Sequence, residues 1–310
     1  MSTIARRQTT AFPAGDREVP AFAAWLGVDG LVDVHVHFMP QRVLDKVWAY
    51  FDAVPGGGET GASGWPIHYR EPEAARIERL RAMRLRAWTA LSYPHKPGMA
   101  AWLNEYAADL ACRVPEAVHS ATFFPEPEAD AYVAEALERG ASVFKVHLQV
   151  GAYDPRDALL APVWRRLAEA AVPVVVHCGS GPEPGAFTGP GPFGEVLARE
   201  PELVAVIAHM GGPEYAAFLD LAEAYPAVHL DTTMTFTDYM ERTIGAPYPP
   251  ELVGRLADLG DRVVLGSDFP NIPHAYAHQL DVLRRLGLGR SWLRAVCHDN
   301  GARLLGLTPA

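Results

Sequence analysis

A repeated rhythm constrains the fold of this chain more than any other feature of its sequence. Short apolar or β-branched runs alternate with longer segments whose apolar residues recur three and four positions apart. This alternation predicts βα units and a parallel sheet. Eight such runs lie at about 31–38, 86–92, 118–124, 142–148, 173–178, 203–209, 227–232 and 262–267.

Helices are expected between these runs. They include the segments 99–114, 129–139, 158–171, 213–225 and 252–260. Runs such as VPVVVH and RVVLGSD are apolar on both faces, as expected for strands with helices outside and packed side chains inside. The pattern predicts an α/β protein with the fold of a (β/α)8 TIM barrel. A doubly wound open sheet has the same alternation, but no Gly-rich phosphate-binding turn follows the first run.

Two segments stand apart from the βα rhythm. Residues 1–30 are expected to form an N-terminal arm that is partly helical around 21–26. The Gly-rich segment 55–64 interrupts the connection after the first run and is a candidate lid or flexible loop. We expect residues 31–310 to form one barrel domain, because no repeat or low-complexity tract indicates a second one.

Composition and charge narrow the possible partners. With 49% apolar and 21% charged residues, the chain is an ordinary globular protein. Its formal net charge of -10 disfavours nucleic acid, which calls for a basic face. Three cysteines far apart do not suggest a disulfide framework, and no stretch approaches the length of a membrane span. We expect a cytoplasmic protein that acts on a small molecule.

The strongest chemical signal is the stretch from Asp33 to His37, which reads DVHVH. Side chains two residues apart on a strand point to the same face, so the imidazoles of His35 and His37 can converge on one metal ion. By itself the pattern is equally compatible with histidines that only form hydrogen bonds in a core.

Three further polar residues end other predicted strands. His177 ends VPVVVH, His209 ends LVAVIAH and Asp268 ends RVVLGSD. In a barrel, the carboxyl ends of the strands surround one mouth, where such enzymes build their sites. The positions of these residues therefore favour a metal site over chance placement.

These motifs resemble those of the amidohydrolase superfamily, in particular the branch that includes aminocarboxymuconate-semialdehyde decarboxylase. The resemblance extends over nearly the whole chain: VDVHVHF at 32–38, VVVHCG at 174–179, AVIAHMGG at 205–212, VVLGSDFP at 263–270 and NGARLLGL at 300–307. It is specific for the superfamily and says little about the reaction. It also implies a possible homodimer.

The resemblance implies a mononuclear metal site. His35, His37, His177 and Asp268 would be the ligands, and a water would complete the site. This nitrogen and oxygen set suits Zn²⁺ best, and Mn, Fe or Co can replace it. His209 would be the general acid or base, with Asp268 also able to accept the proton of the water.

Lys145 leaves the number of metal ions open. It lies in SVFKVH, at the end of the fourth predicted strand, where some superfamily members carry a carbamylated lysine that bridges two metals. His209 would then be a ligand of the second ion. We expect one ion, because the decarboxylase-like branch is typically mononuclear, and Lys145 would then hold a carboxylate of the substrate or pair with an acid.

Weaker candidates for substrate contacts lie near the predicted strand ends. Each could equally well only shape the mouth of the barrel. They are Phe38 and Trp65 as apolar walls, and Tyr93, His147, Asn271 and His274. The remaining histidines are expected to be structural, and Cys178 is expected to be a buried, inert thiol.

Three functions are compatible with these residues. The first is a hydrolase that acts on an ester, lactone or amide of a small carboxylated, cyclic or aromatic compound through a metal-activated water. The second is a non-oxidative decarboxylase of an aromatic or muconate-like carboxylate. The third is a binding protein on the same scaffold, which the intact polar set disfavours because buried polar groups are costly without a ligand.

Overall fold

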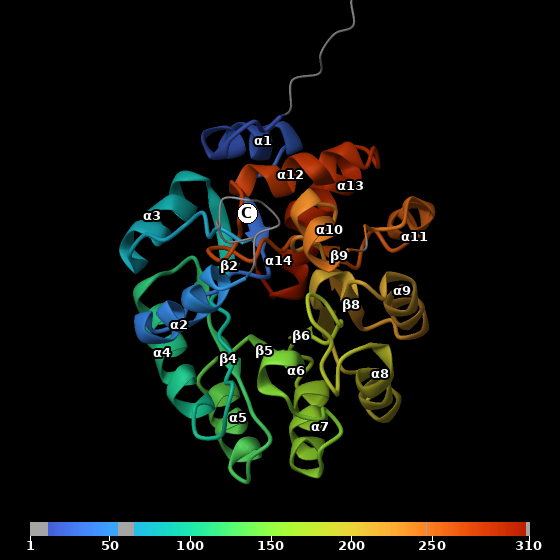
Figure 1. The fold of residues 1–310 in the computed structure, drawn as a ribbon. Helices are drawn as coiled ribbons and strands as arrows, with labels where there is room; N and C mark the ends of the chain where they lie inside the picture. Colours follow the sequence, from blue (N-terminus) through green and yellow to red (C-terminus); the bar gives the residue numbers. More distant parts are fainter. Residues whose placement is uncertain (1–11, 55–64, 246, 308–310) are drawn as a thin grey trace, which may run out of the picture.

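The structure, a computed structural model, describes residues 12–54, 65–245 and 247–307. Over this part of the chain, helices surround the strands in a ring (Figure 1). The strands are β1 (Leu31–Asp33), β2 (Leu85–Thr89), β3 (Ala117–Val118), β4 (Ser120–Thr122), β5 (Val143–His147), β6 (Val174–His177), β7 (Ala205–Ile207), β8 (Val228–Asp231) and β9 (Val263–Val264).

The helices follow the strands in sequence, as the rhythm predicts. The α-helices are α1 (Val19–Leu26), α2 (Gln41–Asp52), α3 (Glu73–Ala82), α4 (Ala100–Arg113), α5 (Ala129–Glu138), α6 (Leu148–Gly151), α7 (Ala161–Glu169), α8 (Pro190–Arg199), α9 (Tyr215–Ala224), α10 (Asp238–Ile244), α11 (Val253–Asp258), α12 (Tyr276–Arg285), α13 (Arg290–Arg294) and α14 (Asn300–Leu304). Short 3-10 helices are η1 (Asp16–Glu18), η2 (Ala158–Leu160), η3 (Ala208–Gly211) and η4 (Pro250–Leu252), and η5 (Ala295–Asp299) is a π-helix.

Each of the eight predicted runs contains a strand, and all ladders are parallel in chain order. The third run is divided into β3 and β4, because the Ser120 hydroxyl accepts from the Ala90 N–H at 2.9 Å and donates to Val118 O. Side-chain hydrogen bonds thus replace part of the ladder. The chain has the (β/α)8 barrel fold that its sequence predicts.

The ladders form two sheets, β1 to β3 and β4 to β9, and do not run around the full circle. Backbone hydrogen bonds join the segments that follow β1 and β9. Val34 N–H donates to Leu265 O at 2.9 Å, and Asp268 N–H donates to His35 O at 2.8 Å. These bonds hold the first and last strands of the barrel side by side, which brings their carboxyl ends together.

The barrel is filled by small branched side chains. One buried cluster takes a valine or alanine from nearly every strand, such as Val143, Val175 and Val264, and includes Ala302 and Leu305 near the C-terminus. Such residues fit the narrow interior of an eight-stranded barrel. A larger cluster lies between the strands and the helices.

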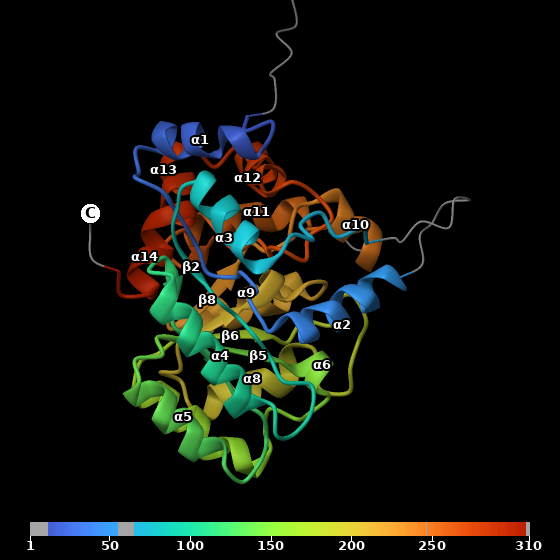
Figure 2. The same ribbon diagram turned by 90° about the vertical axis from the view of Figure 1, so that its left-hand side faces the viewer.

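The N-terminal segment packs on the C-terminal helices. Helix α1 lies beside α12 and α13 in both ribbon views (Figures 1 and 2), and its residues Val19, Phe22, Ala23 and Leu26 are buried. The division of the chain into an arm and a barrel at residue 30 stays a prediction. The candidate lid at 55–64 lies outside the described residues.

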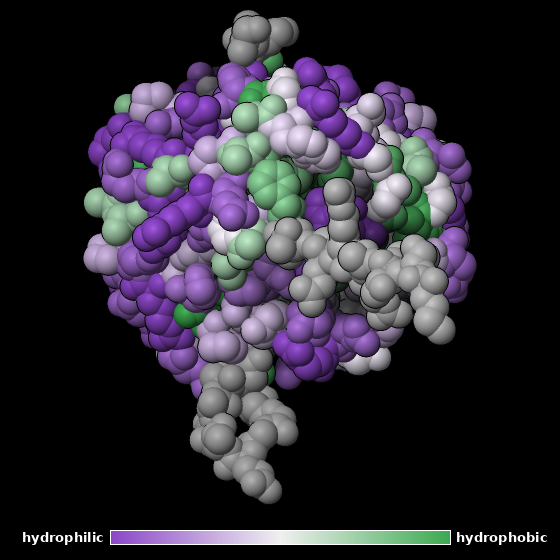
Figure 3. All heavy atoms as spheres, turned by 90° about the horizontal axis from the view of Figure 1, so that it is seen from above, coloured by the Kyte–Doolittle hydropathy of each residue, from purple (hydrophilic) through white to green (hydrophobic). Residues whose placement is uncertain are grey.

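The face seen in Figure 3 is largely hydrophilic, with apolar groups scattered among polar ones. Over the described residues, no helix is both long and apolar enough to cross a membrane.

His229 on β8 is expected to make folding stability depend on pH. Burial lowers the pKa of His229 from 6.5 to about 4, so the unfolded chain binds this proton at a higher pH than the folded protein. The contribution of neutral His229 to the free energy of unfolding is therefore complete above about pH 6.5 and is lost as the pH falls toward 4. The free energy of unfolding, measured by urea titration at several pH values, should therefore fall less on acidification in His229→Gln than in the wild type. The exposed His68→Gln is the control, and equal slopes for all three proteins would refute the assignment.

Candidate metal centre

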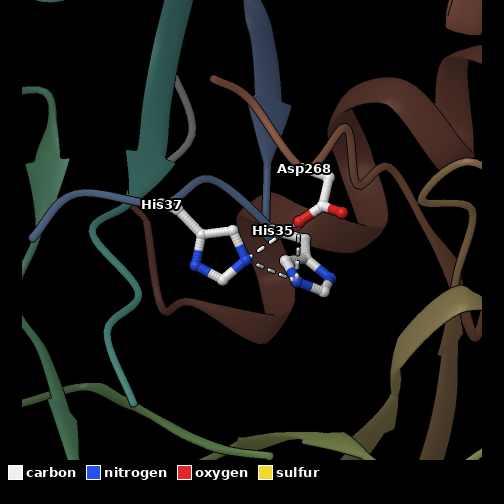
Figure 4. A group of neighbouring side chains, drawn as sticks. All are labelled: His35, His37 and Asp268. Atoms are coloured by element: carbon white, nitrogen blue, oxygen red, sulfur yellow. Dashed lines mark hydrogen bonds and ion pairs between the residues drawn. The ribbon is translucent and has the colours of Figure 1, made fainter. Parts of the chain in front are cut away.

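Three side chains from the two ends of the chain meet at the mouth of the barrel. His35 and His37 belong to the extended segment that continues β1, and Asp268 follows β9 (Figure 4). Both histidines are buried, with exposed fractions of 1% and 3%. One nitrogen or oxygen atom of each of the three residues lies within 4.8 Å of the others.

The donor atoms are in close contact. His37 Nε2 lies 2.9 Å from Asp268 Oδ1 and 3.2 Å from His35 Nε2, and His35 Nε2 lies 3.7 Å from the same Oδ1. Figure 4 shows the two rings and the carboxylate turned toward one another. These three residues are among the four ligands expected from the sequence motifs, and the fourth, His177, is not part of this cluster.

The hydrogen bonds of the imidazoles leave their lone pairs directed at one point. His37 Nδ1 donates to Leu91 O at 3.1 Å, and His35 Nδ1 donates to Asp231 Oδ2 at 2.8 Å. In its neutral form each ring therefore carries its proton on Nδ1, and the two Nε2 atoms then present lone pairs to each other and to the Asp268 carboxylate. Such an arrangement calls for a cation, and two imidazoles with one carboxylate suit a divalent metal. The residues present fit the implied ion.

Asp231 at the end of β8 orients the first ligand. It is fully buried and accepts from His35 Nδ1, from the His209 N–H at 2.9 Å and from the Thr233 N–H at 3.0 Å. Burial alone would raise the pKa of Asp231, but its contacts with His35 and the charges of His209 and Lys145 together outweigh burial and hold the pKa well below the usual range. A carboxylate behind a ligating histidine fixes the ring and raises its basicity.

Lys145 reaches the same centre from β5. Its side chain is buried, with 1% exposed, and Nζ lies 3.2 Å from His35 Nε2. Burial lowers the pKa of Lys145 from 10.5 to about 8. Burial, followed by the positive charge of Lys145, also lowers the pKa of His35 from 6.5 to about 3, so this ring is neutral near pH 7.

Three more histidines lie beside the centre. His177 donates from Nε2 to Gly181 O at 3.0 Å, and its ring stacks on that of His147 at a centroid distance of 3.8 Å. The ring of His209 lies 4.8 Å from that of His177 and 5.3 Å from that of His35. Its Nδ1 donates to Thr233 O at 3.1 Å, which leaves Nε2 as the nitrogen that can accept a proton.

The backbone around the centre is locally strained. His209, Met234 and Asp268 are not glycines, yet they have φ values of 54°, 57° and 71°. Left-handed backbone costs energy for such residues and is concentrated at functional sites. Gly266 is required before Asp268, because a Cβ there would lie 2.8 Å from the Cβ of His35.

A cavity of about 660 Å³ opens above these groups. Its inner end is lined by His35, His37, Lys145, His209 and Asp268. Apolar and aromatic residues line much of the remaining wall, among them Val43, Val47, Tyr50, Phe51, Val54, Tyr93 and Met240. Ligand pockets typically have this size and this mixture of apolar walls and a few polar groups.

Comparison with known proteins identifies the family. A family model described as amidohydrolase matches residues 32–307. The chain belongs to this amidohydrolase family. The family is generally metal-dependent, which agrees with the donor set at the mouth of the barrel.

Solved structures show the same fold at low sequence identity. An uncharacterized TIM-barrel protein from Bordetella bronchiseptica has a TM-score of 0.66 at 17% identity, over 89% of this chain and 98% of that chain. A probable 2-pyrone-4,6-dicarboxylic acid hydrolase from Acinetobacter baumannii has a TM-score of 0.61 at 13% identity, over 90% and 100%. 5-Carboxyvanillate decarboxylase from Sphingomonas paucimobilis has a TM-score of 0.57 at 15% identity, over 90% of this chain and 100% of that chain. No curated protein matches this amidohydrolase.

The weaker candidates for substrate contacts fall into two groups. Trp65, Tyr93, His147 and Asn271 line the cavity of the amidohydrolase, as does His177. Two expectations need correction, because Phe38 and His274 are not among the lining residues.

Phe38 follows His37 directly, so its side chain points to the opposite side of the segment, where its ring stacks on Trp88 at 4.6 Å. His274 turns toward α12, and its ring lies 4.8 Å from that of His278. Both residues are therefore structural rather than walls of the site.

Asp231 was not expected from the motifs, and its replacement tests its role. The Asp231→Asn variant cannot keep a full negative charge behind His35, so we expect the affinity for Zn²⁺ to fall by about 10- to 100-fold. Competition with a chelating dye measures this affinity. Asp238→Asn, which changes an exposed carboxylate on α10, is the control. Wild-type affinity in Asp231→Asn would contradict the orienting role.

Proposed function

We propose that this amidohydrolase is a metal-dependent hydrolase that cleaves an ester, lactone or amide of a small carboxylated, cyclic or aromatic compound. The observation that carries this proposal is the convergence of His35 Nε2, His37 Nε2 and Asp268 Oδ1 at the inner end of the cavity, with His209 beside them. A metal-ligand set next to a titratable group in a large pocket is the arrangement that hydrolytic chemistry requires.

We propose one divalent ion, Zn²⁺, at this centre. His35, His37 and Asp268 would hold it, with His177 as the fourth ligand through Nδ1, the nitrogen that does not bond Gly181 O. A bound ion of this kind supplies a Lewis acid and lowers the pKa of water in its coordination shell.

Protein side chains would manage protons and orient the substrate. His209 has Nε2 available, because Nδ1 is held by Thr233 O, so it can accept a proton from water and return it to the leaving group. Lys145 places an ammonium group at the polar end, where it can hold a carboxylate of the substrate. The apolar walls exclude bulk water, which strengthens these electrostatic contacts.

The His177→Ala variant tests the fourth ligand. We expect this protein to lose most of its metal and its activity while its far-ultraviolet circular dichroism stays nearly unchanged, because the ring lies at the cavity and not in the packed core. Metal content measured by inductively coupled plasma mass spectrometry decides the question. An unaltered metal content would remove His177 from the ligand set.

A decarboxylase is the second candidate, favoured by the buried cation at the end of an apolar cavity. Lys145 could hold a carboxylate there, and apolar surroundings destabilise that charge relative to neutral carbon dioxide. His209 would then deliver the proton that replaces the carboxyl group on carbon.

One incubation separates the two reactions. The zinc-loaded protein is given ester and lactone panels and, separately, aromatic ring carboxylates, in water enriched in oxygen-18. A hydrolase releases acid that carries the isotope, whereas carbon dioxide release without isotope in the organic product would overturn the hydrolase proposal. Metal analysis of the same protein should give one equivalent per chain, and two equivalents with a carbamate on Lys145 would refute the single-ion proposal.

A further inference from the structure

Helix α2 presents a largely apolar face, interrupted by Lys46, to the cavity. Six of its residues and of the turn that follows line the cavity, and their spacing places them on one side of the helix. They are Val43, Lys46, Val47, Tyr50, Phe51 and Val54. In most barrel helices such a face packs on the strands, whereas here it forms part of the cavity lining.

The same helix is anchored by its other apolar residues. Leu44 and Trp48 are buried in the core, with exposed fractions of 0% and 8%. Trp48 Nε1 donates to Asn271 Oδ1 at 3.1 Å, and the Asn271 N–H donates to Asp268 O at 2.8 Å. Helix α2 is thereby tied to the loop that carries a metal ligand.

A second contact fixes the end of α2. The ring of Phe51 stacks on that of Trp65 at 5.5 Å with an interplanar angle of 22°, and Trp65 Nε1 donates to Asn271 O at 2.7 Å. Both tryptophans therefore bond the same asparagine. The apolar wall is held in place before any ligand binds, which lowers the entropic cost of binding.

The cavity combines the polar metal centre with largely apolar walls. The α2 face, Met234 and Met240 supply apolar surface, and the lining outside the metal centre also includes the polar residues Lys46, His95, Gln149 and Glu183. Two exposed apolar side chains, Tyr50 with 53% exposed and Val150 with 41% exposed, also line the cavity.

The volume exceeds the needs of a single small ring. About 660 Å³ equals the space of roughly twenty water molecules at ~30 Å³ each. A single ring carboxylate bound at the metal centre would leave much of this volume unfilled.

We propose that the substrate carries, besides its reacting group and carboxylate, an apolar body that lies along the α2 face. A medium-length acyl chain or a second ring would fill this space. This inference rests on the proposed function, because it takes the metal centre as the place of the reacting group, and it narrows the substrates to those with an extended apolar part.

Binding of simple carboxylates tests the proposal without turnover. Isothermal titration calorimetry of the zinc-loaded protein with acetate, butanoate, hexanoate and octanoate measures the dissociation constants. Each methylene group buried on the α2 face should tighten binding by up to about fourfold. We expect octanoate to bind at least ten times more tightly than butanoate, and equal affinities would overturn the proposal.

Matched variants on the two sides of α2 locate the apolar body. Val47→Asp places a charge in the cavity, and Val47→Trp fills it with apolar volume. Both should weaken octanoate binding by at least tenfold while acetate binding changes little in Val47→Trp. Ala49→Asp, on the exposed side of the same helix, is the control and should bind octanoate as the wild type does. Equal effects of Val47→Asp and Ala49→Asp, or unchanged octanoate binding in Val47→Trp, would refute the proposal.

The two proposals fail in different ways. If octanoate binds tightly through Val47 but no ester, lactone or amide is cleaved, the hydrolase proposal fails and the apolar site stands. If esters are cleaved but affinity is independent of chain length, the hydrolase stands and the proposed substrate body is wrong.

Discussion

Replacement of His37 by alanine is expected to leave the protein without bound metal and to lower kcat/KM by about 10³-fold or more, because the stabilisation supplied by the ion amounts to several kcal/mol. His37 Nε2 is the central atom of the donor set, 2.9 Å from Asp268 Oδ1 and 3.2 Å from His35 Nε2. Without it, the proposed ligand set keeps His35, Asp268 and His177 but loses the donor that contacts both other members of the cluster.

Two measurements test this effect: the metal content of the dialysed protein and the rate of ester hydrolysis. His68→Ala, which removes an exposed histidine, is the matched control and should keep both metal and activity. The fold should survive in His37→Ala, because its main-chain bond to Phe269 O does not involve the side chain. Full metal occupancy in His37→Ala would show that the ion binds elsewhere.

The fold was predictable because the pattern of apolar residues that indicates it is local and periodic. Runs such as VPVVVH are apolar on both faces, and the structure places them in a parallel barrel. The division of the third run into β3 and β4 was not predictable, because it depends on the Ser120 hydroxyl reaching the backbone of Ala90 in another strand. Propensity and spacing carry no information about such a contact.

The cluster of His35, His37 and Asp268 was predictable for a related reason. Residues at the carboxyl ends of different strands are expected to lie close together, since all eight ends meet at one mouth of the barrel. Asp231 occupies such a position at the end of β8, so the signal that indicated Asp268 was present there too. Alternation along the chain would also have placed Phe38 opposite His37.

Other parts of the site could not be read from the sequence. The apolar residues of α2 have the spacing of a helix that packs on a core, and only tertiary structure shows that part of this face borders a cavity. The joint role of Trp48, Trp65 and Asn271 depends on contacts between residues more than 200 positions apart. His274 lies in a loop, where no periodicity indicates the direction of a side chain.

The His209→Asn variant is expected to keep its metal and to lose activity by about 10²- to 10⁴-fold, the range for a general acid or base. Asparagine tolerates the left-handed backbone at this position, where φ is 54°. The bond from the His209 N–H to Asp231 Oδ1 belongs to the main chain and survives the change. The variant therefore removes the titratable ring and leaves its surroundings in place.

The outcome for His209→Asn also bears on the number of ions. His95→Asn, which changes an exposed histidine of the same cavity, is the control and should retain most of the activity. Added imidazole should restore part of the rate in His209→Asn if the missing group is a proton carrier. Loss of metal instead would make His209 a ligand, and the buried Lys145, 3.2 Å from His35 Nε2, would then be the group able to bridge a second ion as a carbamate.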